Sequence, residues 1–340
     1  MKFDYFWELY KMNMEQKIKW GIVGLGGIAH KFAHDLRLVQ NAEINAVASR
    51  SFDKAKDFKK EYDANHAFGS YDELFNCEDV DVIYIATPHT SHKELSIKAM
   101  KHGKHVLCEK PIGINSAEVE EMIVVAKENS VFLMEALWAR FNPSIRKAKE
   151  LVDNGSIGKI GYLHADFAFY ALNRSEEGRL LNPALGGGTL LDIGIYPIFL
   201  SYILLGKPNK ILSSSKFYKT GVEIQTSMIL EYDEAQAVLY SGLTSESKME
   251  AEISGSSGSI FLKPQWHSAK GYSLKKDGVM EHVDMPTPGN GYTYEIEEVQ
   301  SCLKSGKRES DLWSYQNSLD LCQLMDEVRK QNGIKFPFEQ

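Results

Sequence analysis

The first third of the chain alternates between short apolar runs and longer amphipathic ones. The apolar runs are rich in β-branched residues, as buried parallel strands are, and lie at residues 18–23, 44–48, 80–86, 105–108 and 131–135. The runs between them have helical spacing and lie at residues 28–39, 52–61, 71–75, 91–102 and 117–129. Strands that alternate with helices through short connections predict a doubly wound parallel sheet with right-handed crossovers.

The pattern changes near residue 138. A helix is expected at 142–154, and a glycine-rich segment at 186–188 opens an apolar helix that runs to about residue 205. Period-two runs dominate this half, at residues 161–171, 211–218, 223–232, 235–244, 250–255 and 259–262. Strands that follow one another without intervening helices predict an α+β region with a large, open, mainly antiparallel sheet. The tail at 292–331 is helical again.

A length of 340 residues suits two domains. We divide the chain into an N-terminal extension at 1–16, a parallel α/β domain at 17–137 and a second domain at 138–340, whose last helix should pack back on the junction. The extension has helically spaced aromatic residues but lacks the continuous apolar stretch of a signal peptide. Met12 and Met14 leave open a later translation start.

Composition excludes several classes of partner. The formal net charge is −7 and no long basic run occurs, which argues against nucleic acid or an anionic membrane as the main partner. The most apolar stretch, 190–205, is shorter than the roughly 20 residues that a membrane span needs. Four widely spaced cysteines without a C-x-x-C pair are typical of reduced thiols, so we expect a cytoplasmic protein.

A glycine turn follows the first predicted strand. Gly24 permits a tight turn, and Gly26 lets the backbone approach a pyrophosphate. The small Ala29 lets the helix pack closely on the strand, while Gly27 and Ile28 begin the helix whose amides face the phosphates. Alone such a G-x-G-x-x-A pattern is weak, but its place between strand and helix predicts a dinucleotide site and a Rossmann domain.

The end of the second strand indicates which dinucleotide binds. An NAD site wants an acidic residue there for the ribose 2′-hydroxyl. Here the strand ends in Ser49 and Arg50, with Lys54 one turn later. A hydroxyl and a guanidinium suit a 2′-phosphate, so we expect NADP rather than NAD. The alternative is that Arg50 is an ordinary exposed residue at the sheet edge.

Two further loops should open onto the same crevice, because ligands bind outside the carboxyl ends of parallel strands. The loop after the third run contains Thr87, Pro88 and His92, and the loop after the fourth contains Glu109 and Lys110. We expect these residues to contact the cofactor. The Lys110 ammonium can also bind a substrate hydroxyl. The alternative is a solvent-facing lysine, but its place at a strand end, before a proline, favours the functional interpretation.

The run at 186–196 combines three glycines with two polar residues. The glycines allow close approach of the backbone to a ligand. If the segment after them is helical, Asp192 and Tyr196 are four residues apart and share one face. Most such pairs are solvated or packed, but Asp192 has apolar neighbours and is costly there without a polar role.

Other candidate chemistry is weaker. His30 and His34 are four residues apart on a predicted helix, but no third ligand accompanies them, so we expect no metal site. The aromatic residues at 167–170 are expected to be sheet packing rather than a platform for bases. No Ser–His–Asp order suggests acyl transfer.

Taken together and in order, these motifs resemble the glucose–fructose oxidoreductase/inositol dehydrogenase/rhizopine-catabolism family. The motifs are the glycine turn, the run 87–92, residues 109–111 and the run 186–196. The run 135–143 is similar to the branch of dimeric dihydrodiol dehydrogenases and NADP-dependent D-xylose dehydrogenases. The likeness begins near residue 17 and covers nearly the whole remaining chain, and several motifs in order are more specific than any one.

The resemblance assigns roles to particular residues. Lys110 matches the family's active-site lysine and Asp192 its helix aspartate. Tyr196 stands where inositol dehydrogenases carry histidine, which makes an Asp–His relay unfavoured and tyrosine the expected acid/base. The resemblance also implies a cis peptide between Lys110 and Pro111. It further implies subunit pairing through the open sheet, as a homodimer or homotetramer.

The expected activity is NADP-dependent hydride transfer to or from a small sugar, polyol or cyclic diol. The pKa of a free tyrosine is about 10, so Lys110 would have to lower the pKa of Tyr196 for it to act as a base. Asp192 would orient Lys110 or a substrate hydroxyl. The residues expected to contribute to the substrate pocket are Trp138, Arg140, Phe141 and Arg179. The rival hypothesis is a non-catalytic NADP-binding regulator, against which the Lys110, Asp192 and Tyr196 set argues.

Overall fold

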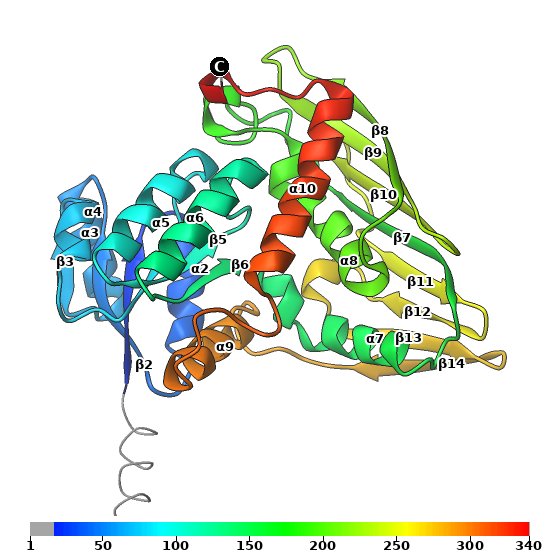
Figure 1. Ribbon diagram of the computed structural model, residues 1–340, viewed down its shortest axis with the longest axis horizontal. Helices are drawn as coiled ribbons and strands as arrows, with labels where there is room; N and C mark the ends of the chain where they lie inside the picture. Colours follow the sequence, from blue (N-terminus) through cyan, green and yellow to red (C-terminus); the bar gives the residue numbers. More distant parts are fainter. Residues whose placement is uncertain (1–16, 340) are drawn as a thin grey trace, which may run out of the picture.

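The computed structural model describes residues 17–339 (Figure 1); the extension expected at 1–16 lies outside them. A six-stranded parallel sheet occupies the first part of the chain, in the order β3-β2-β1-β4-β5-β6. Its strands are β1 (Ile18–Val23), β2 (Ala42–Ala48), β3 (His66–Phe68), β4 (Val82–Ile85), β5 (His105–Glu109) and β6 (Leu133–Ala136). Its helices are α2 (Gly27–Leu36), α3 (Phe52–Tyr62), α4 (Tyr71–Phe75), α5 (His92–Lys101) and α6 (Ser116–Glu128).

This sheet confirms the predicted doubly wound fold. The strands form because their β-branched side chains fill both faces, and all four residues of β4 are buried. The helices begin where side chains cap them: the Ser51 hydroxyl accepts the Lys54 amide at α3, and Asn115 accepts the Glu118 amide at α6. The sequence did not predict β3, which has only three residues and a single exposed histidine at its start.

A second sheet of eight strands follows, in the order β14-β13-β12-β11-β7-β10-β9-β8. Its strands are β7 (Ile160–Ala168), β8 (Lys210–Phe217), β9 (Glu223–Glu231), β10 (Gln236–Gly242), β11 (Ala251–Gly255), β12 (Gly258–Leu262), β13 (Gly271–Lys276) and β14 (Val279–Asp284). Only the β7–β10 pair is parallel, so the prediction of an open, mainly antiparallel sheet is confirmed. The edge strand β14 and its neighbour β13 were missed, because neither shows an alternation of buried and exposed residues and β14 is almost entirely exposed.

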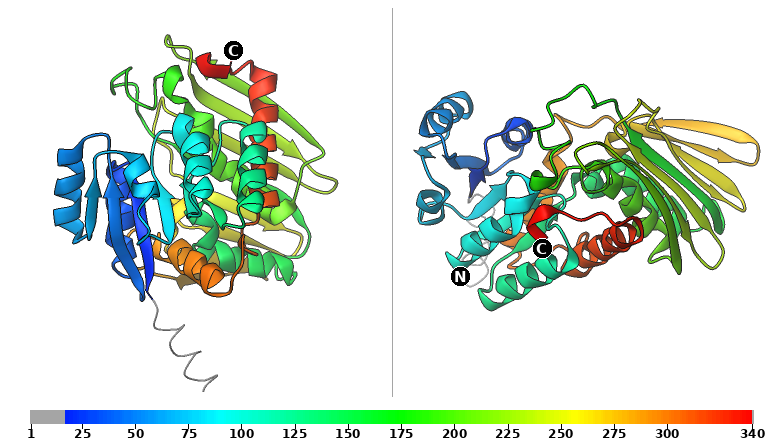
Figure 2. Two further views of the ribbon diagram at one scale, coloured as in Figure 1. Left: turned by 60° about the vertical axis from the view of Figure 1, so that its left-hand side comes forward. Right: turned by 90° about the horizontal axis from the view of Figure 1, so that it is seen from above.

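Helices cover one face of this sheet and leave the other open (Figures 1 and 2). α7 (Pro143–Asp153), α8 (Ile195–Leu205) and α10 (Tyr315–Asn332) pack on the inner face, which faces the first sheet. α9 (Thr293–Lys304) instead contacts α2 of the parallel half. Among the described residues no helix lies on the outer face.

The end of the chain returns to the parallel half. α10 packs against α6 and β6, and the Leu133 amide of β6 donates a hydrogen bond of 3.1 Å to the Arg308 carbonyl. On the other side, the buried Asp35 carboxylate of α2 accepts the backbone amides of Asn290 and Tyr292. These contacts fix the two sheets against each other around one cleft.

Among the described residues, one helical stretch is long and apolar enough to cross a membrane. It covers Pro183–Leu205, 23 residues in all. The most apolar part of this stretch is 78% buried inside the protein, between the second sheet and α10. Its apolar character is therefore accounted for by packing.

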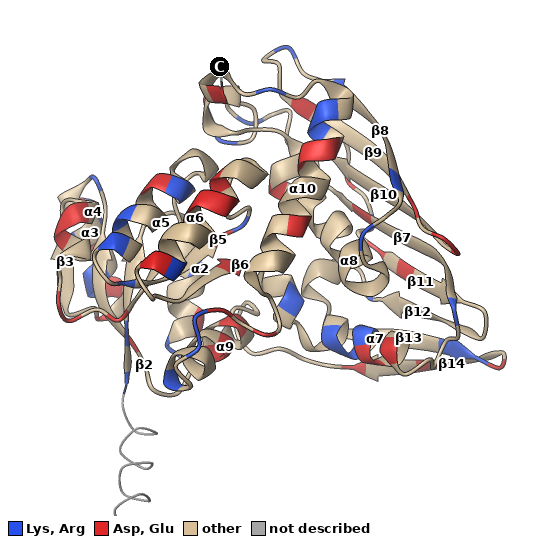
Figure 3. Ribbon diagram, viewed as in Figure 1, with Lys and Arg blue, Asp and Glu red and all other residues tan. Residues whose placement is uncertain are grey.

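Charged residues of both signs are interspersed over the surface helices (Figure 3). On α7, for example, Lys147 pairs with Glu150 at 2.6 Å and Lys149 with Asp153 at 2.9 Å. Such exposed pairs contribute little to stability, about 0–1 kcal/mol each. They do, however, leave no row of a single charge along this helix.

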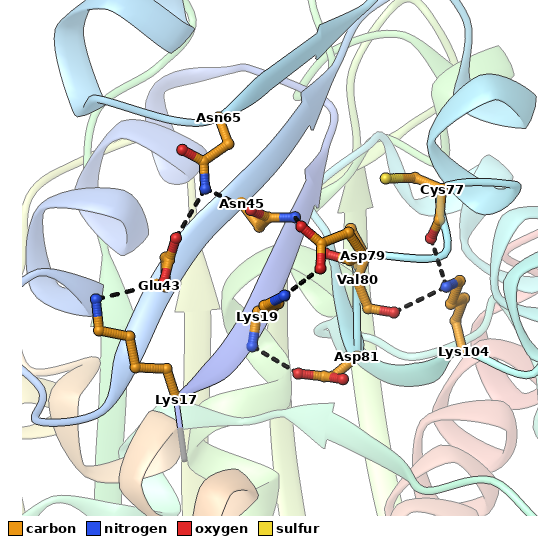
Figure 4. A network of polar contacts seen from close by, with 10 residues as sticks. All are labelled: Lys17, Lys19, Glu43, Asn45, Asn65, Cys77, Asp79, Val80, Asp81 and Lys104. Atoms are coloured by element: carbon orange, nitrogen blue, oxygen red, sulfur yellow. Dashed lines mark hydrogen bonds and ion pairs between the residues drawn. The ribbon is translucent and has the colours of Figure 1, made fainter. Parts of the chain in front are cut away.

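The amino-terminal edge of the parallel sheet is closed by a polar network (Figure 4). Lys19 of β1 forms an ion pair with Asp79, and its amide donates to Asp81 at 2.8 Å. Asn45 occupies a register shift in β2 opposite Trp20 and Gly21, and its side chain bonds Asp79. This edge is satisfied by the chain's own groups, which leaves the opposite, carboxyl edge for ligands.

Candidate active site

A cleft of about 470 Å³ lies where β1, β4 and β5 end and face the second half of the chain. This is the position at which open parallel sheets bind their ligands. Most of the lining residues belong to the motifs predicted from the sequence. The lining residues are Gly27, Ile28, Lys31, Ala86, Thr87, Pro88, His89, His92, Glu109, Lys110, Arg179, Leu185 and Asp192.

Gly24 makes the tight turn at one end of the cleft. Its φ is +86°, and a Cβ there would lie 2.8 Å from the Ala86 carbonyl group. Only glycine fits this position without moving the neighbouring strand end. Gly24 does not line the cleft, but it sets the course of the residues that do.

The start of α2 presents bare backbone beside this turn. Gly26 precedes the helix, no side chain caps it, and a Cβ at Gly26 or Gly27 would meet no atom within 4 Å. The first amides of a helix have no partners inside it, so they can receive a phosphate. Ile28 lines the cleft, whereas Ala29 is fully buried against the sheet. The arrangement fits a dinucleotide pyrophosphate.

Ser49, Arg50 and Lys54 lie at the end of β2, next to the glycine turn. The Gly24 amide donates a hydrogen bond of 3.3 Å to the carbonyl of Ala48, the residue before Ser49. Within residues 17–339, the exposed side chains of Arg50 and Lys54 form no hydrogen bond or ion pair. Both cations are therefore available to a phosphate at this end, although neither lines the cleft itself.

His92 ties two of the cleft loops together. Its ring nitrogens lie 2.8 Å from the Pro111 carbonyl oxygen and 2.9 Å from the Thr87 carbonyl oxygen. Burial lowers the pKa of His92. The ring is fully buried, so its evident role is to hold the loops after β4 and β5 in place. In the same wall the Thr87 hydroxyl and His89 Nδ1 are buried and have no hydrogen-bond partner among the described residues.

Lys110 reaches from the parallel half to the other half of the chain. Its Nζ donates to the Asp192 carbonyl oxygen and lies 3.3 Å from Asp192 Oδ1. The Lys110–Pro111 peptide is cis, as the resemblance implied. Glu109 beside it accepts the Tyr84 hydroxyl and the Lys110 amide, and burial raises the pKa of Glu109.

Asp192 is a buried carboxylate shared by two cations. Arg179 Nη1 lies 2.7 Å from the same oxygen that Lys110 approaches. Burial alone would raise the pKa of Asp192, but the charges of Lys110 and Arg179 outweigh it and hold the pKa well below the usual range. The carboxylate therefore stays ionised and fixes both cations at the cleft.

Two of the three glycines before Asp192 are required by the protein's own packing, and the expectation that this run lets the backbone approach a ligand stays a prediction. A Cβ at Gly187 would lie 2.7 Å from the Asn182 carbonyl oxygen, and one at Gly188 would lie 2.3 Å from either Glu223 oxygen. The segment Leu190–Gly194 is π-helical rather than α-helical, and α8 begins only at Ile195. The wider turn leaves the Asp192 carbonyl free for Lys110.

Tyr196 lies beside Lys110 in a different way from that expected. The Lys110 Nζ sits 5.1 Å from the centre of the phenol ring, while the hydroxyl accepts a hydrogen bond of 2.8 Å from Trp138 Nε1. Burial and the Glu109 carboxyl raise the pKa of Tyr196 well above 10. The expectation that Lys110 lowers this pKa is therefore wrong for this arrangement, because the ammonium faces the ring and not the oxygen.

The motif at 138–141 divides between two places. Trp138 reaches Tyr196, as described. Phe141 is in the core, and the Arg140 Nε donates to the Leu312 carbonyl oxygen at 2.9 Å. Arg140 lines a separate hollow with Arg146, so the structure does not bring Arg140 or Phe141 to the cleft.

Several residues of the site had no sequence motif. His267 stacks on Phe167 with ring centres 4.2 Å apart and lies 5.4 Å from the Tyr196 ring. Tyr292 packs on Trp138 at 5.1 Å. These residues lie far from Tyr196 in the sequence, and only their place in loops after strands or before a helix could have drawn attention to them.

The assembled groups suit acid–base chemistry on a hydroxyl or carbonyl. The ammonium of Lys110 can stabilise a developing alkoxide. The phenol of Tyr196, kept neutral by its raised pKa, can donate a proton. The bare helix start lies along the same cleft, so a dinucleotide and a small substrate can meet there.

Two family models match the chain. The model described as an oxidoreductase family with an NAD-binding Rossmann fold matches residues 18–137. The model of the GFO/IDH/MocA C-terminal domain matches residues 145–261.

Characterised proteins resemble the chain along nearly its whole length. It is 34% identical to scyllo-inositol 2-dehydrogenase (NADP(+)) of Bacillus subtilis, covering 95% of this chain and 99% of that protein. It is 36% identical to trans-1,2-dihydrobenzene-1,2-diol dehydrogenase of Sus scrofa, covering 94% and 98%. A solved structure of a 3-ketoreductase from Actinomadura kijaniata with NADP has a TM-score of 0.85 and 25% identity, covering 93% and 98%.

Proposed function

The chain belongs to the GFO/IDH/MocA family of oxidoreductases, and from this we propose that it is an NADP-dependent dehydrogenase or reductase of a sugar, polyol or cyclic diol. The observation that carries the proposal is that Lys110 meets Asp192, which lines the cleft with it, and the buried Tyr196 ring beside them. These three groups come from two halves of the chain. A protein that only senses a nucleotide has no need of them.

The cofactor is held by residues at the carboxyl edge of the parallel sheet. The amides at the start of α2 receive the pyrophosphate, and Arg50 and Lys54 receive the 2′-phosphate that distinguishes NADP from NAD. Two of the resembling proteins, the scyllo-inositol dehydrogenase and the 3-ketoreductase, are described with NADP. Thr87, Pro88 and Glu109 line the path toward Lys110. When bound, the nicotinamide supplies or accepts the hydride.

Tyr196 is the proton donor and acceptor in this scheme. In the reducing direction its neutral phenol protonates the alkoxide that forms as hydride arrives. In the oxidising direction the substrate hydroxyl must give up a proton, and a phenol of raised pKa accepts one only after losing its own. The raised pKa therefore makes reduction the better-served direction near neutral pH, with oxidation gaining as pH rises.

Lys110 and Asp192 support this transfer. The ammonium polarises the substrate carbonyl and stabilises the alkoxide. Asp192 keeps the ammonium in place through its carbonyl and carboxylate oxygens, and it also anchors the half-exposed Arg179. Of the predicted substrate contacts, Arg179 lines the cleft, and Trp138 is connected to the site through its hydrogen bond to Tyr196.

The second half of the chain also carries the surface that we assign to subunit pairing. On the bare outer face of the eight-stranded sheet, Leu212, Ile229 and Val238 stand directly opposite one another across three strands. Each is 38–41% exposed, as is Tyr162 on β7. A contiguous exposed apolar row is typical of a protein–protein interface, and a second copy presents the same row for a symmetric dimer.

Activity measurements on two variants test the mechanism. Purified protein is assayed with NADP⁺ and a panel of aldoses, inositols and dihydrodiols through the absorbance of reduced nicotinamide. Tyr196→Phe and Lys110→Met should each lower turnover by roughly 10²-fold or more, while NADPH binding is kept. Tyr202→Phe, which removes a hydroxyl from the same helix outside the cleft, should leave turnover unchanged.

Two outcomes count against the proposal. Near-normal turnover in either variant would remove the role given to that residue. Binding of NADPH without turnover across the whole panel would favour the non-catalytic regulator.

A further inference from the structure

His267 occupies an aromatic enclosure around the hydroxyl end of the site. It lies on the short turn Trp266–Ser268, between β12 and β13. Its ring stacks on Phe167 at 4.2 Å with 17° between planes, and lies 5.4 Å from Tyr196 and 5.9 Å, edge-on, from Trp138. These rings give the enclosure apolar walls that suit the C–H faces of a ring-shaped substrate.

The imidazole is the polar exception in these walls. Nδ1 is buried and has no hydrogen-bond partner, and neither ring nitrogen bonds to any described residue. Buried polar atoms are nearly always paired in folded proteins, so an unpaired one calls for an explanation. A pocket that is mostly apolar with one well-placed polar group is the usual form of a small-molecule site.

The ring is also neutral and lies next to residues that contact the cleft. Burial, followed by the charges of Lys110 and Lys31, lowers the pKa of His267 to about 3. Both lysines line the cleft, whereas His267 is connected to it through the Tyr196 ring, which lies 5.4 Å from the imidazole and 5.1 Å from Lys110 Nζ. A neutral imidazole has one nitrogen that donates and one that accepts a hydrogen bond. A hydroxyl group can do both, so it can pair with whichever nitrogen faces it.

We propose that His267 is a specificity-determining residue that hydrogen bonds a substrate hydroxyl other than the one at the reacting carbon, so that the preferred substrate is a sugar or polyol rather than a diol whose remaining ring is hydrocarbon. This inference rests on the proposed function and deepens it. A hydroxyl of a bound polyol pairs the imidazole. A hydrocarbon face at the same place leaves the imidazole unpaired and excludes the water that could have served it.

The reasoning follows from how enclosed sites discriminate. A site built to bond a hydroxyl rejects an analogue that lacks it far more strongly than an apolar pocket rejects an added hydroxyl. The aromatic walls accept either class of ring, because both have apolar faces. The choice between the classes therefore depends on the imidazole, whose Nδ1 has no partner among the described residues.

The test compares His267→Phe with the unchanged protein on two probes. These are scyllo-inositol and trans-1,2-dihydrobenzene-1,2-diol, each assayed with NADP⁺ for kcat and KM. The unchanged protein should prefer the polyol. His267→Phe should lower kcat/KM for the polyol by roughly 10- to 100-fold, mainly through KM, and leave kcat/KM for the dihydrodiol unchanged or higher.

Two further variants guard the interpretation. His267→Gln keeps a donor and an acceptor on a non-aromatic side chain of similar reach and should recover part of the polyol activity, which a purely structural role for the ring would not give. It also decides the question if His267→Phe does not fold, as judged by circular dichroism and NADPH binding. His282→Phe, on the exposed strand β14, is the matched control and should change neither probe.

The outcomes separate this inference from the proposed function. A preference of the unchanged protein for the dihydrodiol, or an equal loss on both probes in His267→Phe, would overturn the role of His267 while leaving the dehydrogenase in place. Absence of turnover on both probes and on the wider panel would overturn the proposed function, and this inference with it.

Discussion

Replacing Glu223 by glutamine should change how the stability of the protein depends on pH. Glu223 begins β9 and is only 1% exposed. Its Oε1 accepts the Leu190 amide at 2.8 Å, at the start of the π-helical turn, while Oε2 has no partner among the described residues. Burial, opposed by backbone amides and the charge of Arg329, raises the pKa of this carboxyl from 4.5 to about 7.

The sign follows from proton linkage. The folded protein holds the Glu223 proton more tightly than the unfolded chain does, so unfolding releases it between pH 4.5 and about 7. The contribution of this proton to stability is fully present below the unfolded-state pKa of 4.5. It is lost as pH rises through the folded-state pKa of about 7. Each pKa unit is worth about 1.4 kcal/mol, so the whole effect is about 3 kcal/mol.

The measurement is urea unfolding followed by tryptophan fluorescence and circular dichroism at several pH values from 5 to 8.5. As pH rises from 5 to 8.5, the free energy of unfolding of Glu223→Gln should increase by roughly 2 to 3 kcal/mol relative to that of the unchanged protein. At pH 5 the variant should be less stable than the unchanged protein, because its amide nitrogen would lie where Oε2 lies and would have no hydrogen-bond partner there. The slope of the difference is therefore the quantity that carries the test.

Glu234→Gln is the matched control, since it removes a carboxylate that is 62% exposed near the end of the same strand. It reports what the loss of an exposed carboxylate does in the same assay. A flat difference for Glu223→Gln would show that the carboxyl titrates normally, and the account of its burial would fail.

Two further predictions concern the cofactor and the assembly. Gly24→Ala should weaken NADPH binding by roughly tenfold or more, because it combines a φ of +86° with a Cβ 2.8 Å from Ala86; Gly103→Ala, with a φ of +73° and open space around it, is the control in the same fluorescence titration. In the proposed dimer Val238→Glu places a charge opposite Ile229 in the apolar row, so analytical ultracentrifugation should show a dimer for the unchanged protein and a monomer for this variant. Equal NADPH affinity in the two glycine variants, or an unchanged mass for Val238→Glu, would refute the respective argument.

Much of the fold could be read from the sequence because its strands are either buried on both faces or alternate cleanly. The apolar runs of β1, β4 and β5 leave little doubt about a parallel sheet. β3 and β14 escaped because one is three residues long and the other is an exposed edge without an apolar side. Their pairing depends on neighbouring strands and not on their own pattern.

The site was predictable where it depends on strand ends. Lys110 follows β5, so topology alone brings it to the cleft. Its position relative to Tyr196 was not predictable, because a π-helical turn at Leu190–Gly194 sets the direction from which α8 begins. Arg140 was expected to contact the substrate because of its charge, but its guanidinium instead donates a hydrogen bond to the Leu312 carbonyl oxygen. Side-chain partners of this kind arise from tertiary contacts that no local spacing records.

The return of α10 to the parallel half has a consequence for how the protein is made. Residues 18–136 leave the ribosome well before α10 (Tyr315–Asn332), which covers α6 and β6 (Figure 1). Until α10 has been synthesised, the face of α6 and β6 that it covers stays exposed. A cofactor that binds during synthesis would therefore bind a domain that α10 does not yet cover. The complete cleft forms only after the second half of the chain has been synthesised.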